Sequence, residues 1–410
     1  MIDGLAGTGI VVTGIVVTGI GIIGSLGIGR ETFWKNFLAG QSGIKPIQEF
    51  DPLESAIHFG GEVEGFRPKD YLSPLVYRKM GRSSRLAVVA SLEALQDARL
   101  EINDLNRDRI GVFAGTGCGN SGLTDEYFVS FMEGGPQGAN PLLFADTVPN
   151  TAGSHISLYH RLRGPITTFC QNLISAELAL IYACRQLQAG LAEAILVVGV
   201  DELSPIIMHA FSVLRGLNPS INPILGGGLV LGEGACVLVL ERREQALFRR
   251  APVYGEIAAF ALNSGVTRAG HFEQEGRAMK KVVQECLEKG EDQGRVPDLI
   301  SLSANFSGEL DPLEFRILRE IFGDDWSGIA LSPLKYFAGE DGGMGTLRLA
   351  ILLLALRDRM IPPTVNPDQL ESGTPWNRRY LPARPGEINQ GLLTGFTFGG
   401  GNACLMVRKV

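Results

Sequence analysis

The chain has few histidines and few cysteines, and their placement excludes several kinds of site. Only five histidines occur in 410 residues, and none lies beyond His271. The six cysteines are scattered without CxxC or any other metal-ligand spacing. The sequence therefore predicts no metal site and no cofactor, and isolated thiols of this kind fit a reducing cytoplasm.

Basic charge and long apolar runs are also scarce. The net charge of −7 gives no support for binding to nucleic acid or to an anionic membrane. The apolar run 9–24 is shorter than the roughly 20 residues of a membrane span, and it lacks the basic flank of a signal peptide. It contains a tandem duplication, 9–13 followed by 14–18, of which the second copy leads into a predicted buried strand. We expect the first copy to be an extension of little functional consequence.

The composition is that of a globular protein with more than one core. Hydrophobic residues make up 45% of the chain and charged residues 20%, which is ordinary for a globular domain. The 410 residues exceed the roughly 250–300 at which single cores stop growing. Two halves are therefore expected, and many of the 53 glycines stand at predicted turns between strands and helices.

Strand and helix patterns alternate in the first half. Residues 110–115 and 194–200 are short apolar runs, and the second is continuous enough to predict a strand buried on both faces. Between them, 174–189 is apolar over most of a helical circumference and stops at Gly190, which suits a helix C-cap. A helix that is apolar nearly all round is typical of a protein core.

Two similar segments suggest an internal duplication. Residues 234–239 and 402–407 each follow a glycine-rich turn, and each has the pattern of a buried strand. Together with the alternating strands and helices, they predict an α/β layered protein of two halves, 1–250 and 251–410.

Several motifs together resemble a known family. They are Arg163-Gly164-Pro165, Gln188-Ala189-Gly190, Gly232-Glu233-Gly234-Ala235 and Phe398-Gly399-Gly400-Gly401-Asn402. In this order and spacing the chain resembles the β-ketoacyl synthases of the thiolase superfamily over essentially its whole length. The resemblance implies the thiolase fold, in which duplicated βαβ-rich halves form a layered α-β-α-β-α architecture, and it implies a tight dimer.

The resemblance also locates three catalytic positions. In such enzymes a cysteine at the N-terminus of the buried helix attacks the acyl thioester, and two histidines stabilise the developing negative charge. Counted from the Arg-Gly-Pro motif, the cysteine position is Leu173; the histidine positions are Asn305 and Glu340. Because no histidine follows His271, no modest shift of register restores either one. The resemblance therefore implies that none of these positions is catalytic.

Other site residues are retained, and the resemblance leaves their roles open. Lys335 is expected to be a structural cation, paired with Glu314 or Asp311, or with Glu340, which needs a partner if it is buried. The glycine-rich turn at Gly400 and Asn402 is expected to be structural rather than an oxyanion hole.

A ketoacyl synthase scaffold without its catalytic side chains resembles the chain length factors. These are the non-catalytic β subunits that pair with an active ketosynthase α subunit in type II polyketide systems and accept chains carried on the phosphopantetheine of an acyl carrier protein. Many of them have glutamine where this chain has Leu173. That departure leaves open whether the product is an aromatic polyketide or a reduced polyene.

In such heterodimers, side chains at the end of an interface tunnel limit the length of the growing chain. The resemblance implies that the segments 123–132 and 142–155 form this wall, with Cys118, Tyr127, Phe128 and Phe131 as the candidate residues. The alternative for each aromatic residue is ordinary packing in the core.

Two other functions compete with this one. The chain is alternatively a divergent ketosynthase or acyltransferase that uses Cys170, three residues before the expected nucleophile. A third possibility is a homodimeric scaffold or acyl-binding protein. A neighbouring gene for an intact ketosynthase would favour the chain length factor.

Overall fold

One mixed sheet runs through the molecule. The computed structural model describes residues 14–51, 57–214, 216–217, 228–290, 296–365 and 380–410, so the first copy of the N-terminal duplication lies outside the described residues. The strand order is β11-β10-β16-β17-β9-β1-β8-β7-β5-β6, with β2 paired to β1. The strands are β1 (Ile15–Gly24), β2 (Gly27–Ile28), β5 (Ile110–Gly115), β6 (Ile166–Phe169), β7 (Ala194–Asp201), β8 (Gly234–Arg242), β9 (Gly255–Ser264), β10 (Leu299–Ser301), β11 (Ala330–Ser332), β16 (Gln390–Phe396) and β17 (Gly401–Arg408).

The two halves of the chain repeat one topology. The first half contributes β6-β5-β7-β8-β1 and the second β11-β10-β16-β17-β9; numbered along each half, both orders are 3-2-4-5-1. The halves join where β1 pairs with β9 through Val16–Glu256 and Val17–Gly255. The two similar segments of the sequence form the equivalent strands β8 and β17. The division into domains at residue 250 stays a prediction.

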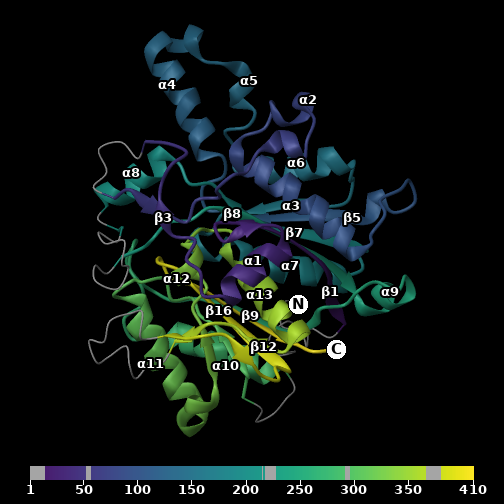
Figure 1. Ribbon diagram of the computed structural model, residues 1–410, viewed down its shortest axis with the longest axis vertical. Coiled ribbons are helices and arrows are strands. Elements are labelled where there is room, and N and C mark those ends of the chain that lie inside the picture. The colour runs from purple at the N-terminus through teal and green to yellow at the C-terminus, as the bar shows by residue number, and fades with distance from the viewer. Residues whose placement is uncertain (1–13, 52–56, 215, 218–227, 291–295, 366–379) are drawn as a thin grey trace, which may run out of the picture.

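Helices lie between the two halves of the sheet and outside them (Figure 1). The helices are α1 (Arg30–Leu38), α2 (Pro74–Tyr77), α3 (Arg82–Ala98), α4 (Ser121–Gly138), α5 (Pro141–Phe144), α6 (Thr151–His160), α7 (Ser175–Gln188), α8 (Pro205–Val213), α9 (Arg243–Phe248), α10 (Arg277–Lys289), α11 (Leu310–Phe322), α12 (Lys335–Ala338) and α13 (Met344–Asp358). The central helices α7 and α13 contact strands of both halves, α3 and α6 cover the first half, and α10 covers the second with α11 against it. This is the layered thiolase-type α/β fold that the sequence predicts.

The central layer explains the apolar runs of the sequence. Every residue of β7 is buried, because a helix covers each face of its sheet. Helix α13 is buried from Met344 to Leu356, and α7 is apolar over most of its surface. Helix α7 ends at Gln188, and Gly190 has φ +71°, the left-handed conformation expected just after a helix end.

One hairpin projects from the first half. Helices α4 and α5 extend above the rest of the molecule in Figure 1. They expose several large apolar side chains: Phe128, Val129, Phe131, Met132, Leu142 and Phe144. Strand β6 forms one end of the sheet, and its Ile166 is also exposed. An open sheet edge and an apolar hairpin on the same half are typical of a surface that a partner covers.

Candidate functional site

Leu173 lies directly before the central helix α7. It belongs to the 3-10 turn η3 (Asn172–Ile174), and only 7% of its surface is exposed. Its backbone N–H donates a hydrogen bond to the Thr397 hydroxyl at 3.3 Å. The turn therefore packs against the glycine-rich loop of the second half, and the side chain at the nucleophile position is a hydrocarbon.

Asn305 and Glu340 meet in the interior. Asn305 follows β10, and Glu340 follows α12 after Gly339, whose φ of +87° is a conformation that glycine adopts without strain. The Asn305 side-chain amide donates to Glu340 Oε2 at 2.8 Å, and the Lys335 ammonium lies 2.7 Å from the same oxygen. All three side chains are buried. Asn305 and Glu340 therefore occupy the two expected histidine positions, and Glu340 forms a buried ion pair with Lys335.

The structure selects one of the partners expected for Lys335. Pairing with Glu314 or Asp311 is wrong: Lys335 contacts Glu340 and the Ser303 carbonyl. Glu314 instead accepts two backbone N–H bonds and one from a threonine hydroxyl. Asp311 accepts two backbone N–H bonds and one from a tyrosine hydroxyl. Burial raises the pKa of Glu314 and raises that of Asp311 to about 7, because charged carboxylates lose hydration there.

A cavity of about 70 Å³ opens beside these residues. Its apolar wall consists of Leu173, Leu203, Ile207, Phe211, Leu231 and Phe398. Its polar wall includes Cys118, Asn172, Asp201, Glu202, Glu340 and Asp341. Among the lining residues that the structure describes, four are acidic and none is basic.

Sequence reasoning missed the importance of two of these acids. Burial raises the pKa of Asp341 well above its ordinary value, and the neighbouring Asp201 and Glu340 carboxylates raise it further. Burial also raises the pKa of Asp201, although hydrogen bonds from Thr116 and from backbone N–H groups oppose that effect. The available signal was position: Asp201 ends the buried strand β7, and Asp341 adjoins Glu340.

A second buried ion pair was also missed. Arg348 in α13 lies 3.2 Å from Glu177 in α7, and neither side chain is exposed. The Arg348 guanidinium also donates to the carbonyls of Ser301 and Thr394, so it links the two central helices to the second half of the sheet. The sequence signal for this pair was a charged residue inside a mostly apolar helix, Arg348 in α13 and Glu177 in α7.

The surroundings of the two thiols near the site favour their neutral forms. Desolvation by the surrounding chain, reinforced by the Asp201 carboxylate, raises the pKa of Cys118 to about 12. Cys170 follows β6 directly, before the turn that holds Leu173, and desolvation raises its pKa as well. Because the thiolate is the nucleophilic form, both shifts oppose nucleophilic catalysis at neutral pH.

The aromatic tunnel candidates lie apart from the cavity. Tyr127, Phe128 and Phe131 belong to α4, and none of them is among the described residues that line the cavity. Cys118 does line it. Phe128 is 55% exposed and Phe131 is 38% exposed. The alternative of core packing is therefore wrong for these two side chains. Tyr127 is half-buried between the rings of Phe128 and Phe144.

Hydrogen bonds of Asn402 hold the glycine-rich loop in place. The Asn402 side-chain amide donates to Asn263 Oδ1 and to the Gly400 carbonyl, each at 3.0 Å. Gly400 has φ +91°, and a side chain there would strike the Gly265 backbone. These contacts fix the turn between β16 and β17.

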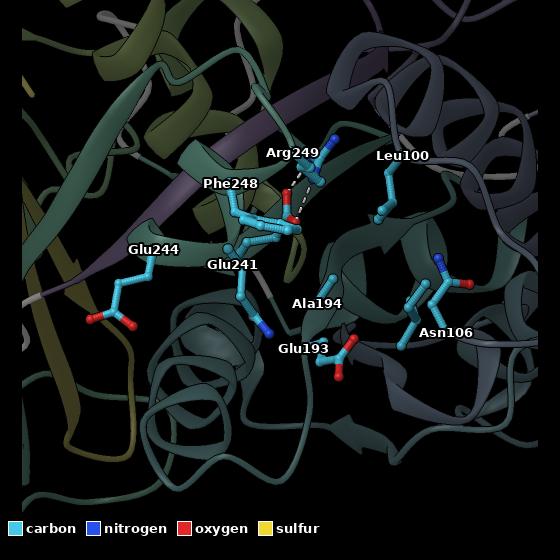
Figure 2. Close-up of a pocket in the computed structure, with 10 residues that line it drawn as sticks. Leu100, Asn106, Glu193, Ala194, Glu241, Glu244, Phe248 and Arg249 are labelled. Atoms are coloured by element: carbon cyan, nitrogen blue, oxygen red, sulfur yellow. Dashed lines mark hydrogen bonds and ion pairs between the residues drawn. The ribbon is translucent and has the colours of Figure 1, made fainter.

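A larger hollow of about 490 Å³ lies elsewhere (Figure 2). Leu100, Asn106, Glu193, Ala194, Phe248 and Arg249 are among its lining residues, and Arg249 pairs there with Glu241. Its described lining contains none of the candidate site residues of the sequence analysis, so its greater size does not make it the candidate site. Within the described ranges, no helix has the length and apolar character to cross a bilayer, and no acidic, histidine or cysteine cluster suits a metal ion.

Two family models match the sequence. The N-terminal domain of β-ketoacyl synthases matches residues 13–246, and the C-terminal domain matches 254–368. The chain belongs to the β-ketoacyl synthase family. One relative is 3-oxoacyl-(acyl-carrier-protein) synthase 2 of Synechocystis sp., 30% identical over 92% of this chain and 94% of that protein. Another is a granaticin polyketide β-ketoacyl synthase of Streptomyces violaceoruber, 25% identical over 93% of this chain and 95% of that protein.

Solved structures share the fold of this family member. The ishigamide ketosynthase/chain length factor superposes with a TM-score of 0.86 at 24% identity, covering 97% of this chain and 99% of that one. A type II polyketide synthase acyl-carrier protein in complex with its ketosynthase (AntDE:AntF) gives a TM-score of 0.85 at 21% identity with the same coverage. At these identities the likeness establishes the fold.

Proposed function

We propose that the chain is a non-catalytic chain length factor, which pairs with an active ketosynthase and shapes the tunnel for a growing polyketide or polyene chain. The observation that carries this proposal is Leu173. A buried leucine stands at the head of the central helix, where a condensing enzyme requires a nucleophile.

The surroundings of Leu173 support the same proposal. A condensing site needs donors aimed at the negative charge that develops on an enolate. Here Glu340 places a carboxylate at the same cavity. The nearby donors Lys335 and Asn305 both bond to that carboxylate, so both are already occupied. The arrangement gives the buried Glu340 carboxylate its partners and opposes the transition state of condensation.

The partner proposed for this subunit is an active ketosynthase, and the third component is an acyl carrier protein that delivers the chain. The exposed apolar hairpin of α4 and α5 and the open edge of β6 support such a heterodimer. The names of the ishigamide and AntDE:AntF structures mention a chain length factor and a carrier protein, respectively, for those proteins.

A divergent enzyme that uses Cys170 is the second candidate. It is favoured by the full-length similarity to relatives named as 3-oxoacyl synthases. The raised pKa of Cys170 and the lack of a histidine at 305 or 340 oppose it.

Product length is expected to respond to the aromatic side chains of α4. Replacing Tyr127, Phe128 or Phe131 by alanine, one at a time in the heterodimer, should let at least one variant make longer products. A ring that closes a packed tunnel stops the chain, because packed interiors resist even one added methylene. The readout is product mass at unchanged yield of the complex.

The exposed Phe248 of α9, changed to alanine, is the matched control and should leave product mass unchanged. If all three α4 variants give the parental product, α4 does not form the end wall. The segment 142–155 then becomes the better candidate.

A further inference from the structure

The projecting hairpin of α4 and α5 buries almost none of its own surface. Both helices lie wholly within the described residues, and among their side chains Ser121 alone is buried. The two helices hold each other, with the rings of Tyr127 and Phe144 5.6 Å apart, and α8 packs beside α4. A helix is normally oriented by the apolar face that it buries in a core. Because this hairpin has no such face, its orientation depends chiefly on the contacts at its base.

Asn120 lies at the centre of that base. It directly precedes α4, and only 1% of its surface is exposed. Its side-chain amide donates to the Thr151 hydroxyl at 2.9 Å, to the Ser84 hydroxyl at 3.0 Å and to the Asp146 carbonyl at 3.4 Å. Its Oδ1 accepts the backbone N–H of Ser84 at 3.3 Å. One side chain therefore ties the start of α4 and the turn after α5 to helices α3 and α6.

This arrangement differs from an ordinary helix cap. Asparagine is favoured before a helix because its oxygen accepts an N–H of the first turn. Asn120 occupies that position before α4, yet its side chain makes no capping hydrogen bond to α4. All of its side-chain bonds cross to neighbouring segments. The side chain therefore fixes the direction in which α4 leaves the molecule.

Gly81 provides the space that Asn120 occupies. A Cβ atom at Gly81 would come within 2.4 Å of Cγ and Oδ1 of Asn120. Gly81 has φ −66° and ψ 170°, which alanine adopts without backbone strain. The change Gly81→Ala would therefore displace the Asn120 side chain while leaving its amide in the protein. This variant separates the position of the amide from its presence.

We propose that Asn120 is a positioning residue for partner binding, whose amide holds the α4–α5 hairpin in the orientation that the ketosynthase meets. The proposal rests on the proposed function, because it assigns the exposed apolar side chains of the hairpin to that interface. A hairpin that is already oriented does not have to be ordered when the partner arrives. Less free energy is then lost on association.

Association with the ketosynthase is the first test. Surface plasmon resonance with the full chain, immobilised from dilute solution, compares Asn120→Leu and Gly81→Ala with the parent at a temperature where circular dichroism shows every protein folded. We expect each variant to raise the Kd about tenfold. The control Asn402→Leu removes a buried amide from the turn between β16 and β17 and should leave the Kd unchanged. An unchanged Kd for both hairpin variants, or equal weakening by Asn402→Leu, would overturn the proposal.

The orientation of the hairpin is measured without the partner. Spin labels on cysteines introduced at Glu133 in α4 and at the exposed Leu105 report one distance by electron–electron double resonance. Cys118 and Cys170 are first changed to serine, and the other four cysteines are buried. We expect a narrow distribution of distances in the parent and a broader one after Asn120→Leu. Equal widths would contradict the anchoring role.

The two measurements separate this inference from the proposed function. If the parent chain binds no ketosynthase, the proposed function fails, whereas the distance distributions still decide whether Asn120 orients the hairpin. A broader distribution with an unchanged Kd would show that orientation does not matter to the partner, and it would overturn the positioning role. If Asn120→Leu does not fold, Gly81→Ala decides both measurements.

Discussion

Changing Lys335 to methionine is expected to lower the free energy of unfolding by about 3–5 kcal/mol. The change leaves the Glu340 carboxylate buried with only the Asn305 amide as a donor, because Lys335 is its single cationic partner among the described residues. Methionine keeps much of the length of the lysine stem, so little packing is lost. Urea or guanidinium unfolding, followed by far-UV circular dichroism, measures the effect.

Two further proteins make this result specific. Lys281→Met removes a cation from an exposed pair, Lys281 with Glu285 at 3.7 Å, and should cost no more than about 1 kcal/mol. Lys335→Met/Glu340→Gln removes both buried charges and should recover most of the lost stability. If Lys335→Met is no more harmful than Lys281→Met, the buried pair does not hold the former catalytic positions together.

Association with a ketosynthase should fail when charge is placed on the projecting hairpin. Expressed alone, the chain should be poorly soluble or self-associated, because an apolar face of this kind aggregates when it is uncovered. Co-expressed with an intact ketosynthase, it should form a one-to-one complex. In that complex Met132→Glu/Leu142→Glu should weaken binding by on the order of 100-fold, since each substitution buries a charge at an apolar interface.

The control variant places a glutamate on an exposed apolar side chain outside the hairpin. Phe248 is 92% exposed and lies on α9, well apart from α4 and α5 in Figure 1. Phe248→Glu should leave the complex intact in size-exclusion chromatography with light scattering. A wild-type chain that is a well-behaved monomer and ignores the ketosynthase would argue against the partner role.

The fold was largely predictable because its central strands and helices are covered on both faces. Strands such as β7, with helices on both faces, must be continuously apolar, and so must helices such as α7 that lie between two halves of a sheet. These runs give strong local signals. Fixed motif spacings then placed the positions 173, 305 and 340. Asn305 and Glu340 prove to be hydrogen-bonded to each other, and Leu173 and Glu340 line the same cavity.

The partners of buried charges could not be predicted in the same way. Lys335 had three acidic candidates within thirty residues of sequence, and only the fold shows that Glu340 is the one it reaches. Arg348 and Glu177 come from different halves of the chain, so their pairing depends on how α13 crosses α7. Likewise, α4 has no pattern that separates an outward aromatic side chain from a buried one. Whether Phe128 packs inside or faces a partner is a property of the tertiary structure.

The most direct test of the non-catalytic role is condensation by the purified chain. The chain is incubated with malonyl carrier protein and an acyl primer, and product formation and intact protein mass are followed by mass spectrometry. The ketosynthase partner and the heterodimer are assayed in parallel as positive controls. The Leu173→Cys variant adds a thiol at the head of α7, where the helix dipole favours the thiolate, but leaves Asn305 and Glu340 in place.

The proposed function predicts no condensation and no acyl-enzyme with the isolated chain or with Leu173→Cys, and full activity only when the ketosynthase is present. Condensation by the isolated chain, or acylation of Cys170, would contradict it and establish a divergent enzyme. Activity of Leu173→Cys near that of the partner would show instead that the positions assigned to the two histidines are mistaken.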